Sequence, residues 1–132
     1  MDKISEMLTT IRNAQMAGHK EVTIPPSKFK LALAKILEEE GFIKSVSRDK
    51  DKNAAIRIIL KYYQISNTEK VPAINGLKKV SKPGQRIYIK NKDIKKVKNK
   101  FGIAIISTSK GIMTGEQSRK VGLGGEYICK IW

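Results

Sequence analysis

Three hydroxyl side chains, a lysine and a glycine stand side by side at Ser107-Thr108-Ser109-Lys110-Gly111. Hydroxyl groups both donate and accept hydrogen bonds, so the cluster suits ribose 2′-OH groups and base edges, and Lys110 can pair with a phosphate. A second corner follows at Gly122-Leu123-Gly124-Gly125-Glu126, where the glycines lack a Cβ that would hold a partner away. Glu126 is expected to accept from backbone N–H groups of the loop at 107–110, or from a base amino group. The two corners predict an RNA-recognition surface; the open alternative is that both are only tight turns.

Spacing and residue counts argue against other chemistries. Ser107 and Lys110 have the Ser-x-x-Lys spacing of acyl-transfer enzymes, but that motif needs a helical turn, and this segment leaves a predicted strand and meets Gly111. No Gly-x-x-x-x-Gly-Lys-Ser/Thr loop is present. His19 is the only histidine and Cys129 the only cysteine, which excludes a disulfide within the chain and a cysteine-based metal cluster. The sequence predicts no catalytic residue, no metal site and no cofactor.

The charge of the chain is strongly positive and unevenly distributed. It carries 27 Lys and Arg against 12 Asp and Glu, a formal net charge of +15, which attracts polyanions. Residues 1–66 hold 12 basic and 8 acidic side chains, a balance of +4, whereas residues 67–132 hold 15 and 4, a balance of +11. The densest basic run predicts phosphate contacts or, alternatively, a solvated face; it comprises Lys90, Lys92, Lys95, Lys96, Lys98 and Lys100. We expect the C-terminal half to face the polyanion.

Composition also bears on where the protein works. Hydrophobic residues make up 40% of the chain, enough for a buried core. No apolar run approaches the ~20 residues that span a membrane. Asp2 and Glu6 lie in an amphipathic pattern that does not resemble a signal peptide. We therefore expect a soluble cytoplasmic protein with no membrane contact.

Hydrophobic periodicity, caps and turn residues predict an α+β fold with two domains. Residues 1–64 are expected to form an N-terminal α-β-α-β-β domain, and the polar stretch from Gln64 to Lys70 marks the boundary. The expected elements are a helix over 4–17, a strand at 20–24, a helix at 28–40 with Ser27 as N-cap, and strands at 42–47 and 54–63.

Residues 65–132 are expected to form a mainly β C-terminal domain with one short helix, packed against the first domain. Thr114 as N-cap, Gln117 as its capping-box partner and Gly122 as the stop predict that helix. The other expected elements are a bent strand at 71–80, a turn at 82–85, a strand at 86–90, a lysine-rich connection at 91–102, and strands at 103–106 and 127–132.

Taken together, these residues resemble the signature of the bacterial small-subunit ribosomal protein S8 family, and the likeness covers the whole chain. Gly115 departs from the family pattern, in which a polar or acidic residue is usual, and should weaken the start of the short helix. The matching segments are Met7–Ala14, Ala34–Leu37, Glu40–Ile43, Ser81–Gly84, Ser107–Thr114 and Gly122–Glu126, with Trp132 at the end.

The resemblance implies a structural ribosomal protein that binds the central domain of small-subunit rRNA during assembly, beside neighbouring small-subunit proteins. It implies that Ser107, Thr108 and Ser109 contact an irregular RNA helix. The further residues carried over are Lys110, Gly111, Gly124, Gly125 and Glu126, with Tyr88 and Lys90 as additional candidates. The alternative is a translational repressor that binds an mRNA hairpin imitating the rRNA site, including one in its own operon mRNA.

Overall fold

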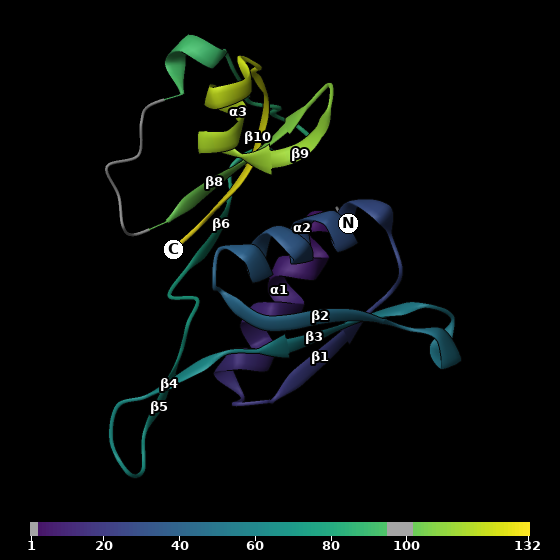
Figure 1. The fold of residues 1–132 in the computed structure, drawn as a ribbon, viewed down its shortest axis with the longest axis vertical. Coiled ribbons are helices and arrows are strands. Elements are labelled where there is room, and N and C mark those ends of the chain that lie inside the picture. The colour runs from purple at the N-terminus through teal and green to yellow at the C-terminus, as the bar shows by residue number, and fades with distance from the viewer. Residues whose placement is uncertain (1–2, 95–101) are drawn as a thin grey trace. The chain divides into compact units, whose positions relative to one another are not determined.

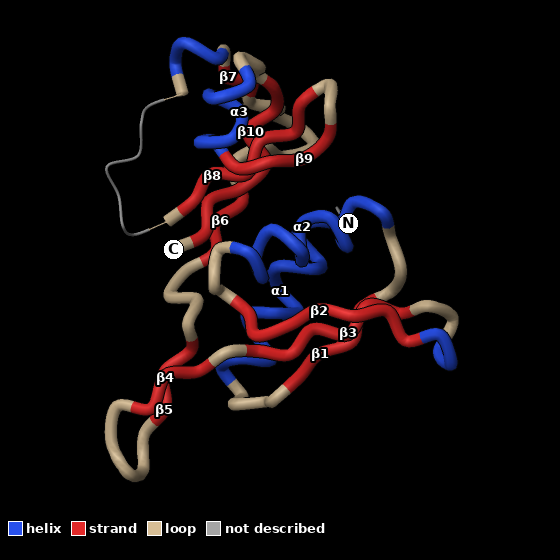
Figure 2. Tube along the Cα trace, in the orientation of Figure 1, coloured by secondary structure: helices blue, strands red, loops and turns tan. Residues whose placement is uncertain are grey.

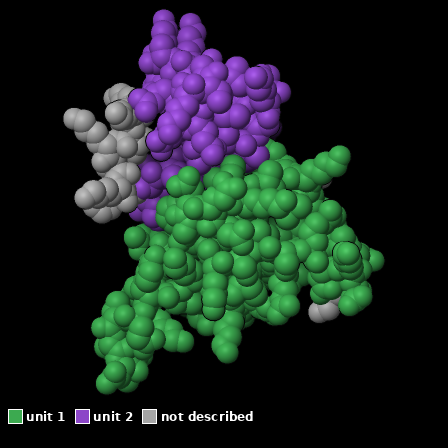
Figure 3. Space-filling model, in the orientation of Figure 1, with its two compact units in different colours: residues 1–75 green, residues 76–132 purple. Residues whose placement is uncertain are grey.

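The computed structural model describes residues 3–94 and 102–132, and it divides into two compact units, Met1–Asn75 and Gly76–Trp132 (Figure 3). The division falls later than the boundary predicted after Gln64. Strand β4 (Tyr62–Gln64) pairs with β5 (Lys70–Pro72), and the Ala73 amide donates to the Lys61 carbonyl at 2.9 Å. These bonds keep the predicted linker with the first unit.

The first unit contains a three-stranded antiparallel sheet with two helices against it, as predicted (Figure 1). Strand β3 is central, between β1 and β2. Its elements are α1 (Lys3–Met16), β1 (Glu21–Ile24), α2 (Lys28–Glu39), β2 (Ile43–Asp49), the 3₁₀ turn η1 (Lys50–Lys52) and β3 (Ala55–Leu60), followed by the β4–β5 hairpin.

Both helices of this unit follow from their apolar stripes and their ends. The α1 side chains at helical spacing are buried, among them Met7 and Ile11, and Gly18 ends the segment with φ +75°. The Ser27 hydroxyl accepts from the Lys30 amide at 3.4 Å, which is the predicted N-cap of α2. Leu33 is among the buried residues of α2, so the stripe faces the core.

The second unit is organised around its last strand, β10 (Gly125–Ile131) (Figure 2). The sheet order is β6-β10-β8-β9, and β7 also pairs with β10. Ile105, Ile106, Cys129 and Ile131 are buried within it. The elements before β10 are β6 (Leu77–Lys79), β7 (Tyr88–Ile89), the 3₁₀ turn η2 (Asn91–Asp93), β8 (Ile103–Thr108), β9 (Gly111–Thr114) and α3 (Gly115–Val121).

The α+β class is confirmed, with three local corrections. The predicted strand at 54–63 is two strands in different sheets, β3 and β4. The predicted strand at 71–80 is two strands in different sheets, β5 and β6, because the segment that holds Asn75 and Gly76 interrupts pairing. Strand β9 was not predicted, because it is short and runs straight into the helix cap. The turn at 82–85 is confirmed by mutual backbone bonds between Lys82 and Gln85 at 3.0 and 2.9 Å.

Helix α3 has the cap that its sequence predicts. The Gln117 amide donates to the Thr114 hydroxyl at 3.2 Å, and the Thr114 amide donates to the Gln117 side-chain oxygen at 3.1 Å. Gly122 ends the helix with φ +77°. Gly115 is buried, and a Cβ there would lie 3.4 Å from the Ala104 Cβ, an ordinary contact. Of the helices that the structure describes, none is long and apolar enough to span a bilayer.

Burial of the single cysteine should make the stability of the protein fall as the pH rises through the alkaline range. Burial raises the pKa of Cys129 to about 12, from an ordinary value of 9.0. The stability linked to this neutral thiol is fully present below the unfolded pKa and is lost as the pH rises toward the folded one. From about pH 7 to about pH 10 the loss should be about 1.4 kcal/mol, because one pKa unit corresponds to about 1.36 kcal/mol. Cys129→Ala should remove that part of the pH dependence in urea unfolding; parallel pH profiles would contradict the prediction.

Candidate nucleic-acid interface

The site residues predicted from the sequence come together at the N-terminal end of strand β10. Glu126 lies opposite Ser107 of β8 on one side and opposite Tyr88 of β7 on the other. Gly125 lies opposite Ile89. Residues that are directly opposite in an antiparallel sheet share a face, so three segments distant in sequence meet in one row. This row carries the predicted interface in the second unit.

The hydroxyl loop is the tight connection between β8 and β9, with Ser109 and Lys110 at its tip. The Thr108 hydroxyl donates to the Gly111 carbonyl at 2.7 Å and accepts from the Lys110 amide at 3.2 Å. Thr108 therefore shapes the loop from inside. The Ser107 and Ser109 hydroxyls make no hydrogen bond to any residue within 3–94 and 102–132. Those two hydroxyls are the ones that the loop leaves open to a partner.

Gly124 and Gly125 allow the chain to pack closely on itself. A Cβ on Gly125 would clash with the Ser107 carbonyl oxygen and lie 2.8 Å from its carbonyl carbon. A Cβ on Gly124 would lie 2.9 Å from the Asn91 nitrogen and 3.0 Å from the Lys90 Cα. Both glycines thus hold β10 against neighbouring backbone, in addition to any role toward a partner. The close approach that the sequence indicated is made, within the protein, by the backbone of residues 89–91 and 107–108, and the predicted approach to RNA stays a prediction.

Glu126 does not hold the hydroxyl loop. Its carboxylate accepts from the Ser81 hydroxyl at 2.6 Å and from Arg86 Nη1 at 3.1 Å. The prediction that it would accept from backbone N–H groups of the loop is wrong, because the side chain points toward the turn before β7. The Ser81 hydroxyl also accepts from the Ile87 amide at 3.0 Å. Glu126 therefore fixes the segment that leads into Tyr88.

Ser81, Arg86 and Asn91 were not among the predicted site residues. The Asn91 side-chain amide donates to the carbonyls of Ser118 and Arg119 at 3.2 and 3.3 Å, so it caps the C-terminal end of α3. Ser81 is 1% exposed, although serine is usually a surface residue. The sequence signals were that Ser81 and Arg86 flank the Lys-Pro-Gly-Gln turn and that Ser81 belongs to the matching segment Ser81–Gly84, and neither indicated a bond to Glu126.

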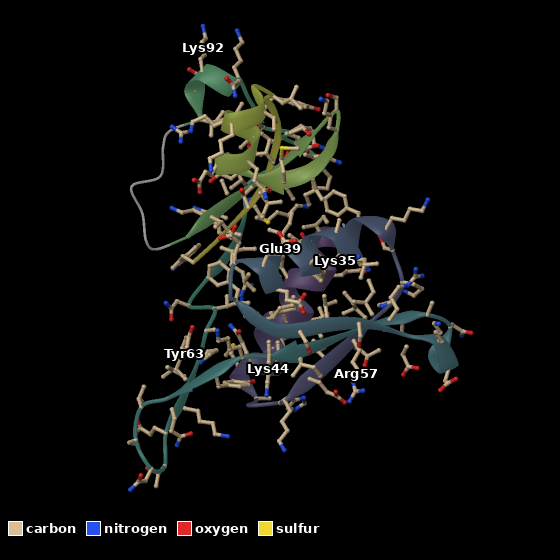
Figure 4. All side chains as sticks on the ribbon, viewed as in Figure 1. Lys35, Glu39, Lys44, Arg57, Tyr63 and Lys92 are labelled. Carbon is tan, nitrogen blue, oxygen red and sulfur yellow. The ribbon has the colours of Figure 1, made fainter. Side chains whose placement is uncertain are left out.

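The outer surface of the interface is cationic and exposed. The Tyr88 side chain is 71% exposed, and Lys90 and Lys110 are also exposed. Lys92, labelled in Figure 4, extends outward from η2. The rest of the predicted basic run, Lys95, Lys96, Lys98 and Lys100, lies outside the described residues.

The arrangement offers binding chemistry. Exposed lysines can neutralise phosphates, open hydroxyls can exchange hydrogen bonds with ribose, and an exposed tyrosine can stack on a base. Among the residues that the structure describes, no three His, Cys, Asp or Glu side chains gather so that they could hold a metal ion.

Comparisons with known proteins identify the family of this chain. The family model for ribosomal protein S8 matches residues 2–132. "Small ribosomal subunit protein uS8" of Caldanaerobacter subterraneus is 53% identical over 132 residues, covering 99% of this chain and 97% of the relative. The protein of the same name from Caldicellulosiruptor bescii is 53% identical over 133 residues, covering 100% and 98%, and that from Nitratidesulfovibrio vulgaris is 49% identical over 131 residues, covering 99% and 98%. The family consists of structural ribosomal proteins and not of enzymes. With a match over nearly its full length, this chain belongs to the ribosomal protein S8 family.

Proposed function

We propose that this protein is a primary rRNA-binding protein of the small ribosomal subunit, which docks on the central domain of the rRNA and helps the subunit to assemble. The observation that carries this proposal is the row of Tyr88, Glu126 and Ser107 across β7, β10 and β8. It gathers every described candidate contact at one end of the more cationic half. Its place of action is the cytoplasmic ribosome, beside other small-subunit proteins.

The proposed mechanism is recognition of RNA shape. The Ser107 and Ser109 hydroxyls exchange hydrogen bonds with 2′-OH groups or with base edges in a distorted helix. Lys90 and Lys110 neutralise phosphates and so position the protein without reading sequence. Tyr88 offers an exposed ring to an unstacked base. Footprinting on small-subunit rRNA should show protection within the central domain, and protection confined to other domains would contradict the docking site.

Ser109→Ala is the direct test of the hydroxyl loop. We expect it to weaken binding to the central-domain rRNA by about 1–3 kcal/mol, because an RNA polar group would lose its buried hydrogen-bond partner. Ser47→Ala on β2 is the matched control, since Ser47 is exposed in the first unit. Filter binding measures both variants. Equal affinities for the wild type and Ser109→Ala would exclude this hydroxyl from recognition.

A second candidate function, translational repression, uses the same surface. The candidate contacts are hydroxyl groups and closely packed backbone turns, so any RNA of the same shape could bind them. An mRNA hairpin that imitates the rRNA site, including one in the protein's own operon mRNA, would then compete for binding. Competition between the rRNA fragment and the operon transcript tests this. Simultaneous binding of both RNAs would show that they do not share one site.

A further inference from the structure

A second basic feature lies in the same unit, along the β6 side of β10, and its residues Lys130 and Trp132 lie at the end of β10 away from the hydroxyl loop. It is a groove of about 530 Å³ between β6, the turn after it and the end of β10. We refer to it as the β6 groove. Its lining residues are Lys78, Lys79, Val80, Lys82, Gln85, Ile87, Lys130 and Trp132. Four of these are lysines, and no acidic residue is among the described residues that line it.

The sheet itself places like charges together in this groove. Lys78 and Lys130 are direct cross-strand partners of β6 and β10, and both are exposed. Like charges directly opposite in an antiparallel pair destabilise the sheet. Lys82 adds a third exposed charge from the turn. The repulsion between these ammonium groups in the free protein would be relieved by an anion that bridges them.

The Glu126 carboxylate is engaged by residues that do not line the groove. Glu126 is held by the Ser81 hydroxyl and by Arg86 on the turn. The pKa of Lys79 is lowered, first by burial and then by the positive charge of Arg86. Glu126 acts in the opposite direction on this pKa, so the positive charge of the groove comes from its four lining lysines.

The aromatic wall of the groove is held in place before any ligand binds. Trp132 and Gly76 exchange two backbone hydrogen bonds, at 3.0 and 3.1 Å. The indole ring lies against Gly76, where an added Cβ would come 2.8 Å from Cη2. Lys130 Nζ lies 5.8 Å from the ring centroid, within the range of a cation–π contact. A ring and an ammonium group thus stand side by side at the groove.

We propose that the β6 groove binds the phosphodiester backbone of RNA, as a contact separate from the hydroxyl loop, with Trp132 beside the ribose or base. This rests on the proposed function, because it extends the footprint of the same RNA. Glu126 and Lys130 are four positions apart on β10, on the order of 13 Å at about 3.3 Å per residue. A small RNA-binding domain can cover about 16 base pairs, so one RNA can reach both ends of the strand. The groove suits RNA better than an acidic protein, because an aromatic ring that can contact a sugar or a base lies beside lysines that can contact phosphates.

The test variant is Lys78→Gln/Lys82→Gln, which leaves the Lys130–Trp132 contact in place. The matched control is Lys50→Gln/Lys120→Gln, which removes two exposed charges outside the groove. Binding to a central-domain rRNA fragment is measured across a salt series. Loss of two phosphate contacts should reduce the slope of log K against log[salt] by about 1.4–1.8 and weaken binding about tenfold to hundredfold near 0.1 M salt. The control should keep the wild-type slope.

Trp132 provides a second readout, because it is the only tryptophan. Its emission should change on RNA binding in the wild type and the control, and the change should shrink in the test variant. An unchanged salt slope together with an unchanged emission response would overturn the groove as an RNA contact. A response to polyglutamate but not to rRNA would overturn it in favour of an acidic protein. If the wild type itself fails to prefer the central-domain fragment over unrelated RNA, the proposed function fails instead.

Discussion

Gly125→Ala is expected to distort the predicted interface and to weaken selective RNA binding strongly. The added methyl group would clash with the Ser107 carbonyl oxygen and lie 3.2 Å from the Thr108 Cα. These are backbone atoms of β8, so no side-chain rotation can relieve the clash, and β10 must move away from β8. We expect a loss of about 3 kcal/mol in the free energy of unfolding, at the upper end of overpacking effects. Affinity for the central-domain rRNA should fall by at least about a hundredfold, equivalent to about 2.7 kcal/mol.

Gly84→Ala is the matched control for this variant. Gly84 lies in the exposed turn of the same unit, and an added Cβ meets no atom within 4 Å there. It should leave both stability and affinity nearly unchanged. Urea unfolding followed by Trp132 fluorescence reports on the second unit, and filter binding reports on the interface. Equal behaviour of the two alanine variants would show that the strand contact between Gly125 and Ser107 does not support the site.

The elements that could be predicted from sequence are those whose cause is local. Helix α3 is an example, since Thr114, Gln117 and Gly122 supply its start, its capping box and its stop within a few residues. The stripe of α1 is another, because burial follows directly from the spacing of Met7 and Ile11.

The site could be predicted only where its residues are consecutive. The hydroxyl loop and the glycine corner are each one short run of residues, and their residue types indicate RNA binding. The role of Glu126 could not be predicted, because its partners Ser81 and Arg86 lie far away along the chain. Pairing of β10 with β6, β7 and β8 brings them together, and strand pairing is a property of the whole sheet.

Gly124 and Gly125 also show what could not be predicted from the sequence. A sequence states that Gly125 has no side chain, but it does not state which neighbour needs the space. Here the neighbour is the backbone of Ser107, within the protein. A residue type that suits ligand binding can therefore serve the fold of the binding loop first, and act on the ligand through it.

Glu126→Ala is expected to have the second large effect, a loss of about 3 kcal/mol in the free energy of unfolding of the second unit. Ser81 is 1% exposed, and its hydroxyl donates to the Glu126 carboxylate at 2.6 Å. Without the carboxylate this buried donor has lost its acceptor, and hydrogen bonds to charged groups contribute about 1.5–3 kcal/mol. The ion pair with Arg86 adds less, because the Arg86 side chain is 49% exposed and such pairs contribute about 0–1 kcal/mol.

Arg86→Gln separates the two contributions, since it removes the ion pair and leaves the Ser81–Glu126 bond. It should cost no more than about 1 kcal/mol, and high salt should reduce that cost further by screening. The cost of Glu126→Ala should largely persist in high salt, because Ser81 is buried and its bond to Glu126 is partly shielded from solvent. Both variants are compared by urea unfolding at low and high ionic strength, with rRNA binding measured alongside. If Arg86→Gln were as destabilising as Glu126→Ala, the exposed ion pair and not the buried hydroxyl would hold the segment that carries Tyr88.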